Sequence, residues 1–356
     1  MHIIGVHLLN NLSGSPRVFA EALNALSEAG HEVDLYTSKG GGFLDEVKGK
    51  KHRLYYAWSE NRIMRLLFFS WSQLLLFFQM LKYWNKPVTF FINTLLPFGA
   101  AAAAWLMRKP VVYYMHETHI SPASLDRFLR FWVKKTAKKA IYVSNFLAEK
   151  FPVDGPEKQV IHNSLPEFFF QQAQAKEAPS TPLKALMIAS LKAEKGLQPF
   201  IKLSKATPNL QFSLVIGAPE AAVNSYFATI SIPKNLTIYP AIQDISTMYA
   251  CHDVLLNMSD PDLLPETFGM TVLEGFAWGL PAIVPPGGGP AELVRHGMEG
   301  FVLHPDETEA ISQLLIQLST DHQAWTALSA NALVRSKDFD RESFGRKLVE
   351  VFETER

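Results

Sequence analysis

Two glutamates stand eight positions apart in the segment PETFGMTVLE, at residues 265–274, on either side of a Phe-Gly pair. We expect Glu266 to lie in a loop that follows a buried strand, and a helix to begin near Phe268 or Gly269 and to run through Glu274 to about Trp278. The first N–H groups of a helix are unpaired and carry partial positive charge, so they attract phosphate. Carboxylates accept hydrogen bonds from hydroxyl pairs. The pattern therefore predicts a site for a diphosphate that carries a sugar at each end.

A purely structural interpretation of the same residues is also open. In it, Glu266 caps the helix and Glu274 is a solvated surface residue. The lack of a side chain at Gly269 favours the binding site, because a ligand can approach the backbone closely there.

The elements around this segment alternate between strand-like and helix-like patterns. At 356 residues the chain is about twice the usual length of one domain. Apolar runs predict strands at 3–9, 32–37, 88–92, 111–115 and 140–144, and again at 183–189, 212–216, 236–239, 254–258 and 281–285. A polar stretch at 171–182 separates the two series. Such alternation predicts two doubly wound parallel sheets, each covered by helices on both faces.

The composition narrows the class of protein. A single cysteine, Cys251, permits no disulfide within the chain and no cysteine cluster for zinc. The start MHIIGVHLLNNLSGS has no basic beginning and no small-residue cleavage site, so it predicts a first strand instead of a signal peptide. We therefore expect a cytoplasmic location.

The net charge of zero conceals a division of charge along the chain. Residues 1–160 contain 20 Lys and Arg against 12 Asp and Glu, whereas the remainder contains 14 against 22. A basic half can attract phosphates, anionic lipid or nucleic acid, or can complement the acidic half.

One segment, residues 66–81, is unusually apolar. Its 16 residues are fewer than the about 20 that cross a bilayer, and Ser70, Ser72 and Gln73 interrupt it, so we do not expect a transmembrane span. A buried domain helix and a helix lying on a membrane surface both remain open. Residues 127–139 add a second basic and aromatic helix in the same half.

The segment PETFGMTVLEGFAWGLPAIVPPGGGPAELVRHGMEGFVLHP resembles the donor-site block of retaining GT-B glycosyltransferases of family 4. The similarity covers the Glu-Phe-Gly start, the second glutamate, the Gly-Leu-Pro strand entry, the Gly-Gly-Pro-Ala-Glu loop and the later Gly-x-x-Gly. Weaker likeness extends to the Gly-His-Glu-Val at 30–33, to Val143-Ser144 and to Asn163. The resemblance implies the GT-B fold, with two Rossmann-like domains facing a cleft. It places the acceptor domain at 1–165, the donor domain at 170–335, and a last helix at 342–356 against the first domain.

The resemblance also implies roles for individual residues in the second domain. Glu274 would bind the ribose diol and Glu266 would face the donor sugar as a catalytic residue. Lys195 matches the diphosphate-binding lysine of the family, and backbone N–H groups would come from Phe268, Gly269 and Met270. The family usually has an arginine where this chain has Ser190, and Lys192 is our candidate for the missing charge.

In the first domain the resemblance points to His116, which would meet the donor sugar across the cleft. A structural histidine is the alternative, and a metal site with His119 is disfavoured because the spacing is not that of H-E-x-x-H. Gly14, in Ser-Gly-Ser before a helix, could approach the donor phosphate or the acceptor. Asp260-Pro-Asp262 resembles the D-x-D signature of another fold, and we expect it to be a loop.

The predicted activity is retaining transfer of a sugar, of the hexosyltransferase type, from a nucleotide diphosphate sugar to an acceptor hydroxyl in glycan or polysaccharide biosynthesis. No metal or other cofactor is expected. The partners would be the nucleotide sugar donor, a glycan or lipid-linked glycan acceptor and an anionic membrane surface, but not nucleic acid. Alternatives are a nucleotide-sugar epimerase or hydrolase and a non-catalytic membrane-surface or sugar-nucleotide-binding protein. An NAD-dependent oxidoreductase is disfavoured because G-x-G-x-x-G is missing.

Overall fold

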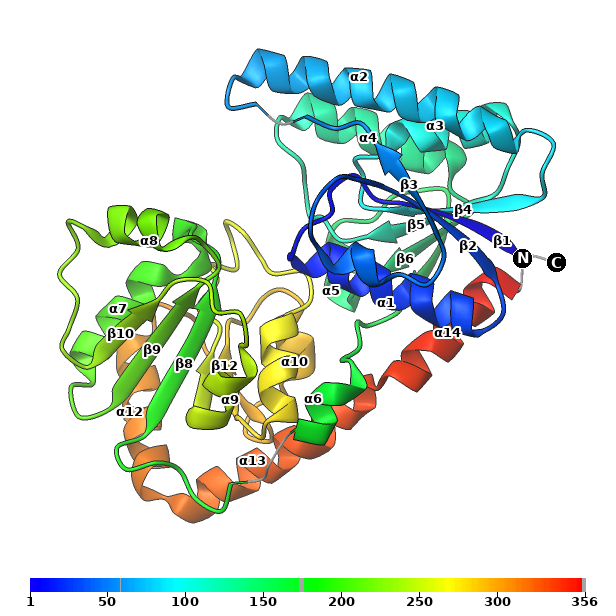
Figure 1. The fold of residues 1–356 in the computed structure, drawn as a ribbon. Helices are drawn as coiled ribbons and strands as arrows, with labels where there is room; N and C mark the ends of the chain where they lie inside the picture. Colours follow the sequence, from blue (N-terminus) through cyan, green and yellow to red (C-terminus); the bar gives the residue numbers. More distant parts are fainter. Residues whose placement is uncertain (58, 173–175, 354–356) are drawn as a thin grey trace. The chain divides into compact units, whose positions relative to one another are not determined.

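The computed structural model describes residues 1–57, 59–172 and 176–353, and the chain divides into two compact units (Figure 1). Unit 1 comprises Met1–Ser164 and the segment from Glu342 onward, and unit 2 comprises Leu165–Arg341. Residues 173–175 of the polar stretch and residues 354–356 of the expected last helix lie outside the described residues. Each unit contains one parallel sheet, which confirms the predicted class of two Rossmann-like, doubly wound domains.

Unit 1 is built on seven parallel strands in the order β3-β2-β1-β4-β5-β6-β7. The direction in which strands are added to the sheet reverses between β1 and β4. These two strands are neighbours, and Ile4 of β1 lies beside Phe90 of β4. In open sheets of this kind, ligands bind outside the carboxyl ends of the strands at such a reversal. The strands are β1 His2–Val6, β2 Glu32–Ser38, β3 Lys50–Leu54, β4 Val88–Asn93, β5 Val111–Met115, β6 Lys139–Tyr142 and β7 Glu157–Val160.

Helices cover both faces of this sheet. Figure 1 shows α1 and α14 on one side and α2, α3 and α4 on the other. The C-terminal helix α14 is tied to the sheet, because the buried Lys139 ammonium donates to the carbonyl of Val351 at 2.7 Å and the Phe352 ring lies 5.1 Å from that of Phe91. The helices are α1 Gly14–Glu28, α2 Arg62–Met80, α3 Phe98–Leu106, α4 Ala123–Thr136, α5 Asn145–Lys150 and α14 Arg341–Glu353, with 3-10 turns η1 Phe43–Glu46 and η2 Leu81–Tyr83.

Unit 2 is built on six parallel strands in the order β10-β9-β8-β11-β12-β13, and its reversal lies between β8 and β11. Its core includes the fully buried Phe200 and Trp325, and the indole of Trp325 donates to the carbonyl of Asp253. The strands are β8 Lys184–Ala189, β9 Gln211–Ile216, β10 Leu236–Tyr239, β11 Val254–Leu256, β12 Ala282–Val284 and β13 Gly300–Val302. The helices are α6 Glu167–Gln172, α7 Leu197–Ala206, α8 Glu220–Phe227, α9 Ser246–Cys251, α10 Met270–Ala277, α11 Pro290–Leu293, α12 Thr308–Thr320 and α13 His322–Ser336, with 3-10 turns η3 Ala193–Lys195 and η4 Lys337–Phe339.

The apolar segment between β3 and β4 forms a longer and more exposed helix than expected. Helix α2 and the turn η2 after it form one continuous helical segment, Ile63–Tyr83, of 21 residues. Of the most apolar 18 residues in this segment, 28% are buried. By length and composition alone, this segment could cross a membrane. The interpretation of residues 66–81 as a buried domain helix is therefore wrong.

Candidate functional site

The reversal in the sheet of unit 2 brings a lysine loop beside a glutamate loop. The loop after β8 turns tightly through η3, and Gly196 then adopts a φ of +79°. A Cβ at Gly196 would lie 1.9 Å from the carbonyl oxygen of Met258, so only glycine allows this close approach to the loop after β11. The N–H of Asp260 also donates to the carbonyl of Glu194 at 2.9 Å. The two loops are thus joined backbone to backbone.

Glu266 and Lys195 meet where these loops join. The Lys195 Nζ lies 3.4 Å from Glu266 Oε1, and both side chains are about a fifth to a quarter exposed. Glu266 Oε2 accepts hydrogen bonds from Asn257 Nδ2 at 2.6 Å and from Ser259 Oγ at 3.3 Å. These contacts hold the carboxylate at the carboxyl end of β11. The interpretation of Glu266 as a helix cap is wrong, because α10 has Gly269 at its N-cap and no side-chain capping bond there.

The N-terminus of α10 is available to a ligand. The helix begins at Met270, one residue after the αL position of Gly269, whose φ is +103°. Among the described residues, the N–H groups of Gly269, Met270 and Thr271 have no hydrogen-bond acceptor. Unpaired N–H groups at a helix start bind anions. Phe268, by contrast, is buried and its ring packs 6.1 Å from that of Phe339.

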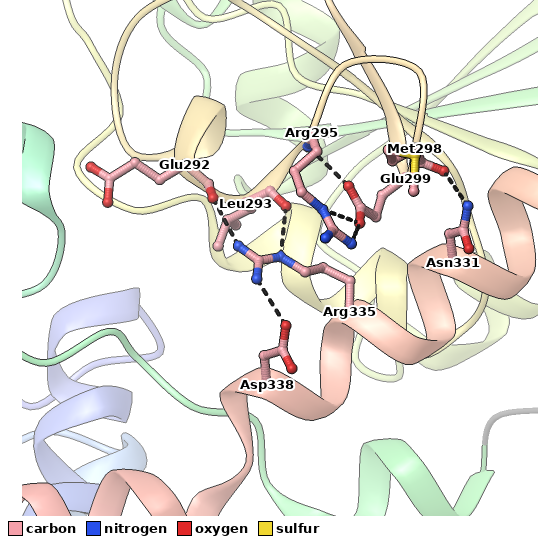
Figure 2. Close-up of polar contacts among 8 residues, drawn as sticks. All are labelled: Glu292, Leu293, Arg295, Met298, Glu299, Asn331, Arg335 and Asp338. Atoms are coloured by element: carbon pink, nitrogen blue, oxygen red, sulfur yellow. Dashed lines mark hydrogen bonds and ion pairs between the residues drawn. The ribbon is translucent and has the colours of Figure 1, made fainter.

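The glycine loop after β12 supports the backbone of Glu266. The N–H of Gly289 donates to the carbonyl of Glu266 at 2.7 Å. Figure 2 shows how the following helix α11 is fixed: the Arg335 guanidinium donates to the carbonyls of Leu293 and Glu292 and pairs with Asp338. Arg335 of α13 therefore fixes the end of α11, the short helix that directly follows the loop bonded to Glu266.

A second ion pair closes the turn that follows α11. Arg295 donates through its backbone N–H and its guanidinium to Glu299, whose side chain is fully buried (Figure 2). Asn331 of α13 donates to the carbonyl of Met298 in the same turn. These contacts fix the conformation of the turn.

Glu274 lies inside α10 and is only 5% exposed. Its Oε2 accepts a hydrogen bond of 2.6 Å from the hydroxyl of Tyr249, which is itself fully buried. The interpretation of Glu274 as a solvated surface residue is therefore wrong. A buried carboxylate held by a tyrosine is positioned to receive further hydroxyl donors.

Ser190 stands where the family usually has arginine, directly after β8. It is partly buried, and its carbonyl accepts the N–H of Lys192 at 2.8 Å. The Lys192 side chain is exposed, and no ion pair involves it in the described part of the chain. Its charge is therefore free to act on an incoming anion.

In unit 1, polar groups gather at the carboxyl ends of β1, β4 and β5. His7 Nδ1 lies 3.0 Å from the Asn93 amide nitrogen, and the His116 ring lies 4.4 Å from the ring of Tyr114. Burial lowers the pKa of His7 to about 4. Burial also lowers the pKa of His116 to about 3, with a smaller contribution from repulsion by His7 when that imidazole is protonated. Both imidazoles are thus neutral at physiological pH. Within the described residues, His116 Nε2 and Asn93 Oδ1 are buried without a hydrogen-bond partner.

The remaining expectations in unit 1 and around β11 concern three residues. Gly14 is the first residue of α1, with open space around it, so a ligand could reach its backbone. His119 is exposed and contacts the hydroxyl of Thr118. The side chain of Asp260 accepts the N–H groups of the two residues after Pro261, and the segment is a loop, as expected.

Several site residues were not predicted from the sequence. Asn257 directly follows the buried strand β11 and Ser259 comes two residues later, which is a usable signal, whereas nothing local marks Tyr249. In unit 1, His7 and Glu117 also follow strands of the sheet. A polar residue just after an apolar run is the pattern that could have identified four of these five.

The stability that Glu117→Gln gains over the wild type is expected to be larger above pH 7 than at pH 5. Burial raises the pKa of the Glu117 carboxyl from 4.5 to about 7. The stability that this raised pKa contributes is complete below pH 4.5 and is lost as the pH rises through 7. The variant avoids that loss, worth about 3 kcal/mol at ~1.4 kcal/mol per pKa unit. Urea unfolding of both proteins at pH 5 and pH 8 measures the difference.

The exposed Glu149 provides the control for that experiment. Glu149→Gln removes the same charge in unit 1 and should unfold like the wild type at both pH values. Parallel stability curves for Glu117→Gln and the wild type would contradict the prediction.

Two family models match the chain. The model described as Glycosyl transferases group 1 matches residues 169–335, and the model described as Glycosyltransferase Family 4 matches residues 12–165. The first match contains Lys195, Glu266 and Glu274, and the second contains His116. Together they cover most of both units.

Individual relatives and solved structures agree with these matches. The chain is 37% identical over 76 residues to sucrose synthase of Beta vulgaris, a match that covers 20% of this chain and 10% of that enzyme. It is 24% identical over 382 residues to N-acetyl-alpha-D-glucosaminyl L-malate synthase of Bacillus anthracis, across 99% of this chain and 95% of the relative. The crystal structure of Anabaena HepE with UDP and glucose superposes with a TM-score of 0.81 at 17% identity, over 99% of this chain and 100% of that one. This structural likeness shows a shared fold.

Proposed function

Because this chain belongs to glycosyltransferase family 4 and has the GT-B fold, we propose that it transfers a sugar from a nucleoside diphosphate sugar to an acceptor hydroxyl, with retention at the anomeric carbon. The observation that carries the proposal is the pairing of Lys195 with Glu266 beside the open N-terminus of α10. Cation, carboxylate and unpaired N–H groups are the groups that a diphosphate sugar requires.

Each of these groups has a proposed task. The Lys195 ammonium and the N–H groups of α10 would stabilise the negative charge that develops on the departing diphosphate. Lys192 would add charge at the position where Ser190 replaces arginine. Glu266 would face the donor sugar as a catalytic residue, and the buried Glu274 would accept the ribose hydroxyls. These cationic groups provide what a metal ion provides elsewhere, so we propose a reaction without a metal.

Retention follows when the acceptor attacks from the face that the diphosphate leaves. A phosphate oxygen then takes the acceptor proton while the new glycosidic bond forms and the old bond breaks. The neutral His116 can donate or accept one hydrogen bond to a sugar hydroxyl without adding charge to the site. We propose a glycan acceptor for unit 1, in free or lipid-linked form, and a cytoplasmic site of action in glycan or polysaccharide biosynthesis.

A binding and turnover screen over UDP-, GDP- and ADP-sugars tests this function. HepE was solved with UDP-glucose, so UDP-sugars are the first donors to try. We expect one donor to bind saturably and, with an oligosaccharide acceptor mixture, to yield a glycosylated product of unchanged anomeric configuration in the presence of EDTA. Mass spectrometry and NMR identify the product.

The other outcomes separate the rival functions. Free sugar without acceptor product would indicate a hydrolase, and an altered sugar still linked to nucleotide would indicate an epimerase. Saturable donor binding without turnover for any acceptor would indicate a sugar-nucleotide-binding protein. An inverted product, or loss of turnover in EDTA, would contradict the proposed mechanism.

A further inference from the structure

Helix α2 exposes an apolar stripe along its whole length. Ile63, Leu67, Trp71, Leu74 and Phe78 recur at helical spacing, and each is between 46% and 72% exposed. Between residues 63 and 80, the exposed polar side chains are those of Ser70 and Gln79. A surface helix of a water-soluble protein normally presents polar residues on this side.

The opposite side of α2 carries its buried polar residues. Ser72 and Gln73 are 3% and 1% exposed. The Gln73 side chain accepts the N–H of Gly99 in α3 at 3.0 Å, and a Cβ on Gly99 would lie 2.2 Å from the Gln73 carbonyl oxygen. The two backbones therefore touch, and α2 is docked along α3 through the side that contains Ser72 and Gln73. The same side contains the buried Phe69, Leu76 and Met80, so α2 is apolar on its exposed side as well as on its buried side.

The two neighbouring helices extend the apolar surface. Trp105 of α3 is 50% exposed, and Phe128 and Phe131 of α4 are 43% and 54% exposed. Ring contacts link the three helices, with Phe98 lying 5.8 Å from Phe69 and 5.0 Å from Phe128. Figure 1 shows α2, α3 and α4 on the same side of the sheet. Exposed apolar area of this extent marks an interaction surface.

Cations border this surface, and anions are nearly absent from its sequence. Residues 61–140 contain 12 Lys and Arg but only Glu117 and Asp126 as acidic residues. The ammonium of Lys135 lies 5.5 Å from the centre of the exposed Trp105 ring, so a cation and an aromatic residue are in contact at the edge of the apolar surface. Aromatic and basic residues around an apolar helix face are typical of helices that lie in a bilayer interface.

We infer that α2, flanked by α3 and α4, seats unit 1 on an anionic lipid bilayer, with the apolar stripe of α2 inserted among the headgroups. The insertion is parallel to the surface, because the inner side of α2 is bonded to α3 and the exposed apolar stripe runs along the opposite side. A helix crossing the bilayer would have to break the contact between Gln73 and Gly99. The inference is independent of the proposed sugar transfer, since it concerns binding alone.

Vesicle sedimentation of the full chain tests this inference. We expect binding to phosphatidylcholine vesicles with 30% phosphatidylglycerol and weaker binding to pure phosphatidylcholine. In 0.5 M NaCl, binding to the anionic vesicles should fall to about the level seen on pure phosphatidylcholine and persist there. Salt screens the cations but not the apolar contacts. The triple variant Leu67→Gln, Trp71→Gln, Phe78→Gln should lower the partition coefficient at least tenfold on both vesicles. The double variant Lys134→Gln, Lys135→Gln should lower it several-fold on the anionic vesicles only.

A matched variant controls for the loss of exposed apolar side chains in general. Leu263→Gln, Ile316→Gln, Val334→Gln alters three residues of unit 2 with 47% to 66% exposure and should bind like the wild type. Circular dichroism and the melting temperature show that all variants fold. Binding that disappears completely in 0.5 M NaCl, or a triple variant of α2 that binds like the wild type, would overturn the inference. A wild-type dimer without vesicle binding, made monomeric by the α2 variant, would assign the surface to a second copy of the chain.

Discussion

The Glu266→Gln variant is expected to lose turnover by a factor of about 10² to 10³, with little change in donor affinity. The amide retains the shape of the side chain and can still accept the hydrogen bond from Asn257, so the loop should keep its conformation. What disappears is the negative charge opposite Lys195. That charge sets the position of the ammonium and faces the reacting sugar in the proposed mechanism. Initial rates with a saturating donor measure the effect.

The control for Glu266 is Glu194→Gln in the adjoining loop. Glu194 is exposed and contributes its backbone carbonyl to the contact between the loops, which the substitution leaves in place. It should retain nearly full turnover. If Glu266→Gln keeps more than half of the wild-type rate, Glu266 has no catalytic role and the site needs another assignment.

The Glu274→Ala variant is expected to weaken donor binding by about 10- to 100-fold, as the loss of charge-assisted hydrogen bonds worth ~1.5–3 kcal/mol predicts. Turnover at saturating donor should change much less, because the ribose is remote from the bond that breaks. Calorimetric titration with the nucleoside diphosphate measures the affinity. The nucleotide is preferable to the donor sugar here, since it separates binding from hydrolysis.

Tyr249→Phe is the companion of that experiment. It removes the hydroxyl that donates to Glu274 but leaves the carboxylate in place, so we expect a smaller loss of affinity, within about tenfold. Equal affinity for the nucleotide in wild type and Glu274→Ala would show that the buried carboxylate serves only the fold.

Local patterns were sufficient to predict the centre of the fold. The helix expected to start near residue 269 and to end near 278 is Met270–Ala277, and the apolar strands of both sheets are close to their predicted ranges. The strands that were missed, β3, β7 and β13, lie at sheet edges. Edge strands need not be apolar on both faces, and Lys50–Leu54 and Glu157–Val160 read as KKHRL and EKQV, without an apolar run.

The site was predictable only in part, because its supporting residues come from different elements. Glu266, Glu274 and Lys195 carry a sequence pattern, whereas Tyr249 is joined to Glu274 across 25 residues. The exposure of α2 could likewise not be predicted from the sequence, because a buried helix and an interfacial helix can have the same length and hydropathy. Which side of the helix Ser72 and Gln73 occupy is decided by packing against α3.

The placement of α14 in unit 1 has a consequence for synthesis on the ribosome. All seven strands of that sheet are made by Val160, but Val351 and Phe352, which contact Lys139 and Phe91, are made only after the whole of unit 2. Translation of the intervening 165–341 takes roughly 10 to 35 s at ~5–20 residues per second. During this interval the nascent sheet lacks its closing helix, so we expect chaperones to bind it until α14 has been made.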